Sequence, residues 1–126
     1  MMIAAILESG RLERLYTGLS LLVSAAADGR PARGLVSFGA LAPMLDPDLR
    51  ARASASGAVA DAETFARSLA ELRDTARELE DCRLWACAAA VELTAASAEA
   101  VEARLDGVMS TPRFLREVAG ADLVVV

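Results

Sequence analysis

Two kinds of hydrophobic pattern alternate along this chain. Met1–Leu7 is short and apolar throughout, which is typical of a strand buried on both faces of a sheet. Apolar residues then recur between positions 12 and 26 with the i, i+3, i+4, i+7 spacing of an amphipathic helix. Asp28–Pro31 ends this helix, because glycine suits the position after the last turn and proline cannot continue it.

The same alternation continues to the end of the chain. Short apolar stretches predict further strands at Gly34–Phe38, Cys82–Ala86, Asp106–Met109 and Ala121–Val126. Helical spacing and capping residues predict helices at 40–45, 61–79, 88–93, 97–104 and 111–119, with Asp61, Ser97 and Thr111 as N-caps and Pro112 in the first turn. Residues 46–60 show little periodicity, so we expect a mobile or weakly helical segment there.

Each predicted strand is separated from the next by enough residues for a helix. Such long connections are typical of a parallel sheet with helices on both faces and right-handed crossovers. We therefore predict an α/β fold: one three-layer α/β/α domain over residues 1–126, Rossmann-like, with a parallel sheet of about five strands.

The composition narrows the classes of partner. The chain is 55% hydrophobic and carries a net charge of −5, and its thirteen basic residues are all arginines scattered among acids. Nucleic-acid binding needs a clustered basic surface, and anionic membranes repel an acidic protein, so we expect neither partner. No segment has the length or flanking charges of a signal peptide or a membrane span, which predicts a cytoplasmic protein.

The cysteines and the absence of histidine limit the chemistry. Cys82 and Cys87 lie five positions apart on or beside a strand, roughly 16 Å between Cα atoms, which is too far for a disulfide. Without histidine, a zinc site would need ligands shared between subunits, and Ser-His-Asp or Cys-His catalysis is excluded. Neither a phosphate loop nor a GxGxxG motif follows the first strand, so we expect no metal and no cofactor.

Three loops are expected to meet at one edge of the sheet. Ligands of open parallel sheets bind at the carboxyl ends of the strands. That rule selects Cys87 and a crevice formed by Glu8, Ser9, Gly10, Ser37, Phe38 and Gly39.

Cys87 is the main candidate for chemistry. It stands between a strand and a helix, where free N–H groups stabilise a thiolate, and we expect a pKa between about 7 and 8 if the thiol reaches solvent. The alternative is that Cys87 is a small buried hydrophobic residue. Cys82, at the start of its strand, is expected to be structural.

Three stretches resemble the DsrE/DsrF-like family. They are the opening strand with Glu8–Gly10 and the helix start Arg11–Leu15, the segment Cys82–Ala90, and Asp106–Val108 followed by Thr111–Leu115 and a closing apolar strand. The resemblance implies a homo-oligomer, a trimer or hexamer. In the sulfur-relay members it further implies that the residue matching Cys87 accepts sulfur as a persulfide from a donor protein and passes it to an acceptor.

A second hypothesis stays open beside sulfur transfer. The chain has no acid–base machinery and no second cysteine placed to resolve a disulfide. It would then be a non-catalytic oligomeric binding or assembly module on the same fold, with Cys87 structural.

Overall fold

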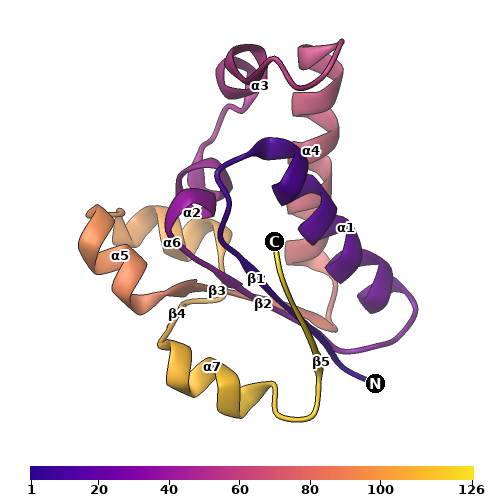
Figure 1. The fold of residues 1–126 in the computed structure, drawn as a ribbon, viewed down its shortest axis with the longest axis vertical. Helices are drawn as coiled ribbons and strands as arrows, with labels where there is room; N and C mark the ends of the chain where they lie inside the picture. Colours follow the sequence, from indigo (N-terminus) through magenta and orange to yellow (C-terminus); the bar gives the residue numbers. More distant parts are fainter.

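Five parallel strands form a single sheet in the order β4-β3-β2-β1-β5 (Figure 1). The structure, a computed structural model, describes all 126 residues. The strands are β1 (Ile3–Leu7), β2 (Ala32–Val36), β3 (Cys82–Cys87), β4 (Val108–Met109) and β5 (Asp122–Val125). The predicted α/β fold is confirmed, because every crossover contains at least one helix.

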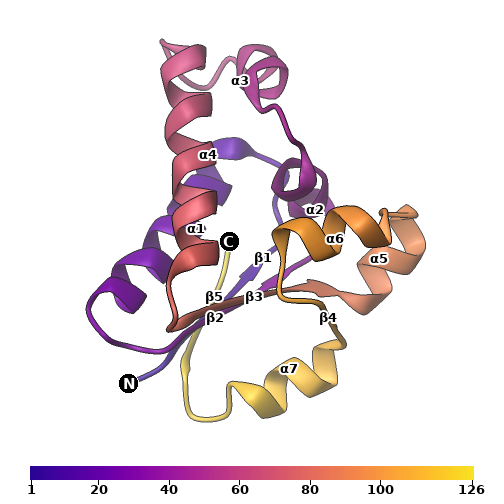
Figure 2. The same cartoon turned by 180° about the vertical axis from the view of Figure 1, so that it is seen from behind.

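Six helices lie on one side of the sheet and one lies on the other. The chain moves one strand along the sheet at each step from β1 to β4, so right-handed crossovers place these connections on the same face. The step from β4 to β5 runs back, which puts α7 alone beneath the sheet (Figure 2). The helices are α1 (Leu12–Ala27), α2 (Phe38–Leu45), α3 (Arg50–Ser56), α4 (Ala62–Glu78), α5 (Ala88–Thr94), α6 (Ala98–Arg104) and α7 (Thr111–Glu117).

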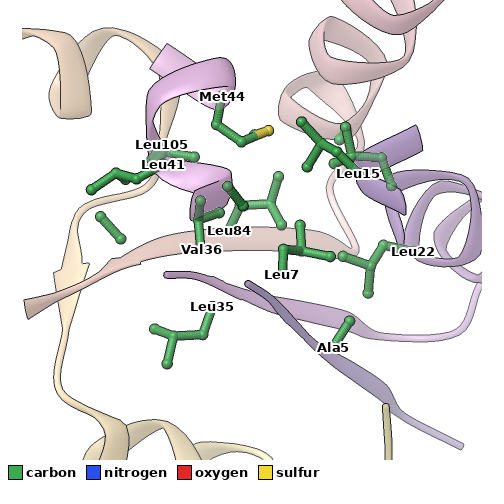
Figure 3. Close-up of a cluster of buried hydrophobic side chains, with 14 of the residues drawn as sticks. Ala5, Leu7, Leu15, Leu22, Leu35, Val36, Leu41, Met44, Leu84 and Leu105 are labelled. Carbon is green, nitrogen blue, oxygen red and sulfur yellow. The ribbon is translucent and has the colours of Figure 1, made fainter. Parts of the chain in front are cut away.

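The densest part of the core lies between the sheet and the upper helices. Leu7, Val36 and Leu84 rise from three neighbouring strands toward leucines of α1 and the residues of α2 (Figure 3). Helix α1 approaches closely, because a Cβ at Gly18 would overlap the side chain of Leu7. Small residues therefore bring α1 against the sheet.

The lower face is covered more thinly than its apolar strands predict. Phe114 of α7 and Val118, which follows that helix, are buried against it, and the ring of Phe114 meets Trp85 edge-on at 6.3 Å between centroids. Leu123 and Val125 of the edge strand β5 stay exposed. One short helix does not cover five strands.

The second strand lies two residues earlier than Gly34–Phe38. Pairing with β1 begins at Ile3 opposite Ala32 and ends at Leu7 opposite Val36. Phe38 adopts a φ of +30°, which no strand accommodates, and α2 starts there instead of at position 40.

A helix also forms within residues 46–60. Leu49 and Ala53, four positions apart, are buried in the core cluster and hold α3 in place. The Asp48 carboxylate accepts the backbone N–H of Arg50 at 3.0 Å and pairs with its guanidinium. Two apolar anchors were too few to be visible as periodicity.

Two of the three predicted N-caps are confirmed and one is wrong. Asp61 accepts the N–H of Thr64 at 3.0 Å, and Ser97 accepts that of Ala100 at 3.3 Å. The cap of α7 is Ser110, which accepts the N–H of Arg113 at 3.3 Å, and not Thr111. The hydroxyl of Thr111 is thereby left for another contact.

None of the seven helices combines the length and the apolar character that crossing a membrane requires.

Candidate functional site

Cys87 lies where three elements meet at the carboxyl edge of the sheet. It is the last residue of β3 and the N-cap of α5. On one side β2 ends and leads through Ser37 into α2; on the other, Cys87 is in register with Met109 of β4, just before α7. The position expected from the sequence is confirmed.

Neighbouring hydrogen-bond donors lower the pKa of Cys87. The residue is only 4% exposed, and the thiol makes no short capping bond to α5. Burial raises the pKa of Cys87, but the N–H groups of Ala90 and Ala89 and the hydroxyls of Ser37 and Thr111 outweigh it, so the net pKa is lowered. The pKa shift has the direction that the sequence predicted for a thiol that reaches solvent, although Cys87 is buried. The site favours a thiolate without any basic side chain.

Thr111 is a residue that the sequence did not identify as part of the site. Its predicted role as a helix cap belongs to Ser110, and its hydroxyl instead helps to lower the pKa of Cys87. The available signal was a hydroxyl residue two positions beyond Met109, the register partner of Cys87. Using that signal required knowing that β3 and β4 are neighbours.

The residues of the predicted crevice separate into two groups. Gly10 and Gly39 pack backbone against backbone, since a Cβ on Gly10 would lie 2.9 Å from the Gly39 carbonyl oxygen. The Glu8 carbonyl accepts the N–H of Ala40 at 3.1 Å, which joins the β1 loop to α2. Backbone contact fills this part of the edge, while Ser37 follows β2, the strand next to β3, and its hydroxyl lowers the pKa of Cys87.

Neither the side chain of Glu8 nor that of Ser9 forms a hydrogen bond with Cys87. The Glu8 residue is exposed. The Ser9 hydroxyl accepts the N–H of Arg11 at 3.1 Å and shapes the turn before α1. We therefore assign Ser9 a structural contact.

Phe38, the residue after Ser37, begins α2 in a strained and exposed conformation. Its φ of +30° is unusual for a bulky residue, and the residue is 45% exposed. It lines a hollow of about 190 Å³ between α2 and α5, together with Leu41, Ala42, Leu45, Thr94 and Ala96. An apolar hollow thus begins at the residue that follows Ser37.

Cys82 lies at the opposite end of β3, and its pKa is shifted in the opposite direction. It is buried and unpaired. Burial, followed by the nearby Asp106 carboxylate, raises the pKa of its thiol to about 11. Of the two thiols, only Cys87 has a lowered pKa.

A larger hollow, of about 510 Å³, lies away from Cys87 between the start of α1 and α3. Its two arginines are already paired, Arg11 with Glu13 and Arg52 with Asp46. No group of three or more cysteine, aspartate or glutamate side chains is arranged to hold a metal ion.

Comparison of the sequence with models of known protein families finds no match, and comparison with curated proteins finds none either.

Proposed function

We propose that this protein is a sulfur carrier in which Cys87 holds a sulfane sulfur as a persulfide. The observation that carries the proposal is the place of Cys87 at the end of β3 and the start of α5, where neighbouring N–H and hydroxyl groups lower the pKa of its thiol although the residue is buried. The resemblance to the DsrE/DsrF-like family supports the same chemistry. In this proposal the donor and acceptor are proteins, and the reaction takes place in the cytoplasm.

The transfer proceeds by thiol–persulfide exchange. The Cys87 thiolate attacks the terminal sulfur of a donor persulfide, R–S–SH. The S–S bond of the donor breaks, R–S⁻ leaves with the electron pair, and Cys87 becomes Cys–S–SH. An acceptor thiolate then repeats the step on Cys87. No external oxidant or reductant is consumed, because the sulfane sulfur moves with its oxidation state unchanged.

The absence of a general base suits this reaction. Persulfide exchange needs an attacking thiolate and a leaving thiolate. Cys87 attacks in the first step and leaves in the second, so hydrogen-bond donors that stabilise its thiolate assist both steps. Ser37, Thr111 and the α5 backbone supply that stabilisation in both directions.

A persulfide-loading experiment tests the proposal. The Cys82→Ala variant, with Cys87 as its single thiol, is incubated with glutathione persulfide, desalted and weighed by mass spectrometry. We expect an adduct of one sulfur atom on Cys87, and its loss when a small acceptor thiol is added. Cys87→Ser is the matched control. Absence of the adduct on Cys87, under conditions that load glutathione itself, contradicts the proposal.

The burial of Cys87 supports a second candidate, a binding or assembly module in which the thiol is structural. Iodoacetamide labelling of the native protein separates the two functions. The sulfur-carrier proposal predicts faster alkylation of Cys87 than of Cys82. Equal and slow alkylation of both favours the module.

We further propose that the protein assembles as a homo-oligomer, a trimer or hexamer. The lower face of the sheet, covered only by α7, leaves Leu123 and Val125 of β5 exposed. Burying these side chains against a second copy removes them from water. Light scattering at micromolar concentration should give a multiple of the monomer mass, and a monomer alone contradicts this proposal.

A further inference from the structure

Helix α7 covers Cys87 on the lower face of the sheet (Figure 2). Trp85 points to this face, because its ring meets that of Phe114 in α7. Side chains two positions apart on a strand share a face, so the side chain of Cys87 points toward α7 as well. The hydroxyl of Thr111, in the first turn of α7, accordingly helps to lower the pKa of Cys87. Since Cys87 is only 4% exposed, a donor molecule reaches its sulfur only after a covering element has moved.

Few interactions hold α7 against the sheet. Phe114 is the only buried residue of the helix, and Val118, just after it, is the only other buried residue between Ser110 and Gly120. The charged side chains of α7 form no salt bridge and no hydrogen bond. The strand that precedes the helix, β4, is two residues long. Segments with so few buried anchors open at a lower cost in free energy than the unfolding of the whole domain.

Gly120 gives the far end of α7 a place to turn. Its φ is +85°, in the left-handed region that glycine enters without strain. No heavy atom lies within 4 Å of the point where a Cβ of this residue would stand, so the space beside the turn is open. Pairing with β1 resumes at Asp122, whose N–H donates to the Met2 carbonyl at 3.2 Å. Rotation at Gly120 therefore moves α7 and leaves the sheet in place.

The cover of Cys87 on the other face is anchored more firmly. Helix α5 begins at the thiol and continues into α6, which buries Val101. Leu105, directly after α6, is also buried. Arg77 of α4 donates to the carbonyl oxygen of Glu102 at 3.2 Å and joins α6 to the long helix. Of the two covers, α7 is therefore the one that opens at the lower cost.

We propose that α7 is a lid over Cys87, which moves away from Trp85 and Cys87 by rotation at Gly120, and that sulfur exchange takes place only while the lid is open. This inference rests on the proposed sulfur-carrier function, since it states how the thiol of such a carrier is reached. Closure after loading shields the persulfide from other thiols in solution. The opened helix takes Thr111 with it, so the lid couples access to the sulfur with the loss of one donor to the thiolate.

Two matched valine variants test the lid. Val118→Ala removes two methyl groups that hold α7, at a position about 10 Å along the chain axis from Thr111. Val101→Ala removes the same groups from α6, and the two valines are almost equally buried, at 4% and 3% exposure. Both variants are made on a Cys82→Ala background, so that iodoacetamide reacts with Cys87 alone. Urea unfolding measures the global stability of each variant.

We expect Val118→Ala to speed the alkylation of Cys87 about tenfold, because the closed state loses the burial of two methyl groups and the open state does not. Val101→Ala destabilises the closed and open states equally. Its alkylation rate should therefore equal that of the parent protein, although the variant unfolds at a lower urea concentration. The rate of loading by glutathione persulfide should follow the same pattern.

Every other pattern of alkylation overturns the lid. Equal acceleration in both variants means that Cys87 is reached by unfolding of the whole domain. Acceleration in Val101→Ala alone means that α5 and α6 are the cover that moves, and no acceleration in either means that the thiol is reached without opening. The sulfur-carrier function fails separately: if alkylation shows the expected pattern but glutathione persulfide never loads Cys87, α7 still opens over the thiol and only its proposed use is refuted.

Discussion

At the scale of single residues, the proposed reactivity of Cys87 depends on neutral groups. Two hydroxyls and two backbone N–H groups lower its pKa against the effect of burial. Arginine would stabilise a thiolate more strongly, but it would also hold an anionic product. Neutral donors favour a thiol that both receives and releases sulfur.

Removing one hydroxyl should slow the reaction of Cys87. Thr111→Val deletes a donor to the thiolate, so the pKa of Cys87 rises and its alkylation by iodoacetamide at neutral pH slows by about three- to tenfold. Ser37→Ala should act in the same direction. The measurement is the alkylation rate against pH on a Cys82→Ala background.

Two variants control for changes that are merely structural. Thr111→Ser keeps the hydroxyl and should retain the wild-type rate. Thr17→Val removes a hydroxyl that bonds only the Glu13 carbonyl within α1 and should change nothing. A pH profile of Thr111→Val that superimposes on that of the wild type would contradict the role of Thr111.

At the scale of elements, one buried arginine fixes the carboxyl end of α2, the helix that begins just after Ser37. Arg73 of α4 is 4% exposed, and its Nη1 donates to the carbonyls of Pro43, Met44 and Asp46, at 2.9, 3.3 and 2.7 Å. These carbonyls close the carboxyl end of α2, where the ordinary helix bonds run out. Arg73 therefore acts as a cap supplied from another helix.

Arg73→Met should destabilise the fold by about 2–4 kcal/mol. The variant removes the shared donor of three carbonyls, and unsatisfied buried polar groups are costly. Urea unfolding measures the loss. Arg67→Met, an exposed position on the same helix, should change stability by less than about 0.5 kcal/mol. Equal stabilities of the two variants would contradict the capping role.

The elements also show what the sequence could and could not predict. Apolar stretches and helical spacing located every strand and every long helix, because buried faces impose their periods on the residues. Helix α3 lacked that signal, since only Leu49 and Ala53 anchor it. The start of α2 was missed because a φ of +30° at Phe38 follows from its fixed neighbours and not from its own preference.

At the scale of the whole molecule, the winding of the sheet creates the site. Three successive crossovers in one direction place six helices on one face, and the single return places α7 on the other. The first turn of α7 then lies beneath the end of β3, where Thr111 acts on Cys87. The strands are uniformly apolar, so their sequences do not reveal their order in the sheet. The sequence therefore identified Cys87 and Ser37 but not Thr111.

The two thiols, at opposite ends of β3, have opposite pKa shifts. The pH dependence of the unfolding free energy of the whole protein should reflect this difference. Burial, and after it Asp106, raises the pKa of Cys82 to about 11. An unfolded thiol ionises near pH 8.5. Below that pH both states hold the proton. Above it the unfolded chain releases the proton first, so the free energy of unfolding falls as pH rises toward 11.

Comparing wild type with Cys82→Ala isolates this contribution. Between pH 8 and about pH 10.5, the wild type should lose about 2 kcal/mol more of its unfolding free energy than the variant. Urea unfolding in the presence of a reductant measures both. Cys87, whose pKa is shifted downward and so contributes with the opposite sign, is common to the two proteins and cancels. Parallel pH profiles would mean that Cys82 ionises as readily in the fold as outside it, and the interior around β3 would then be open to water.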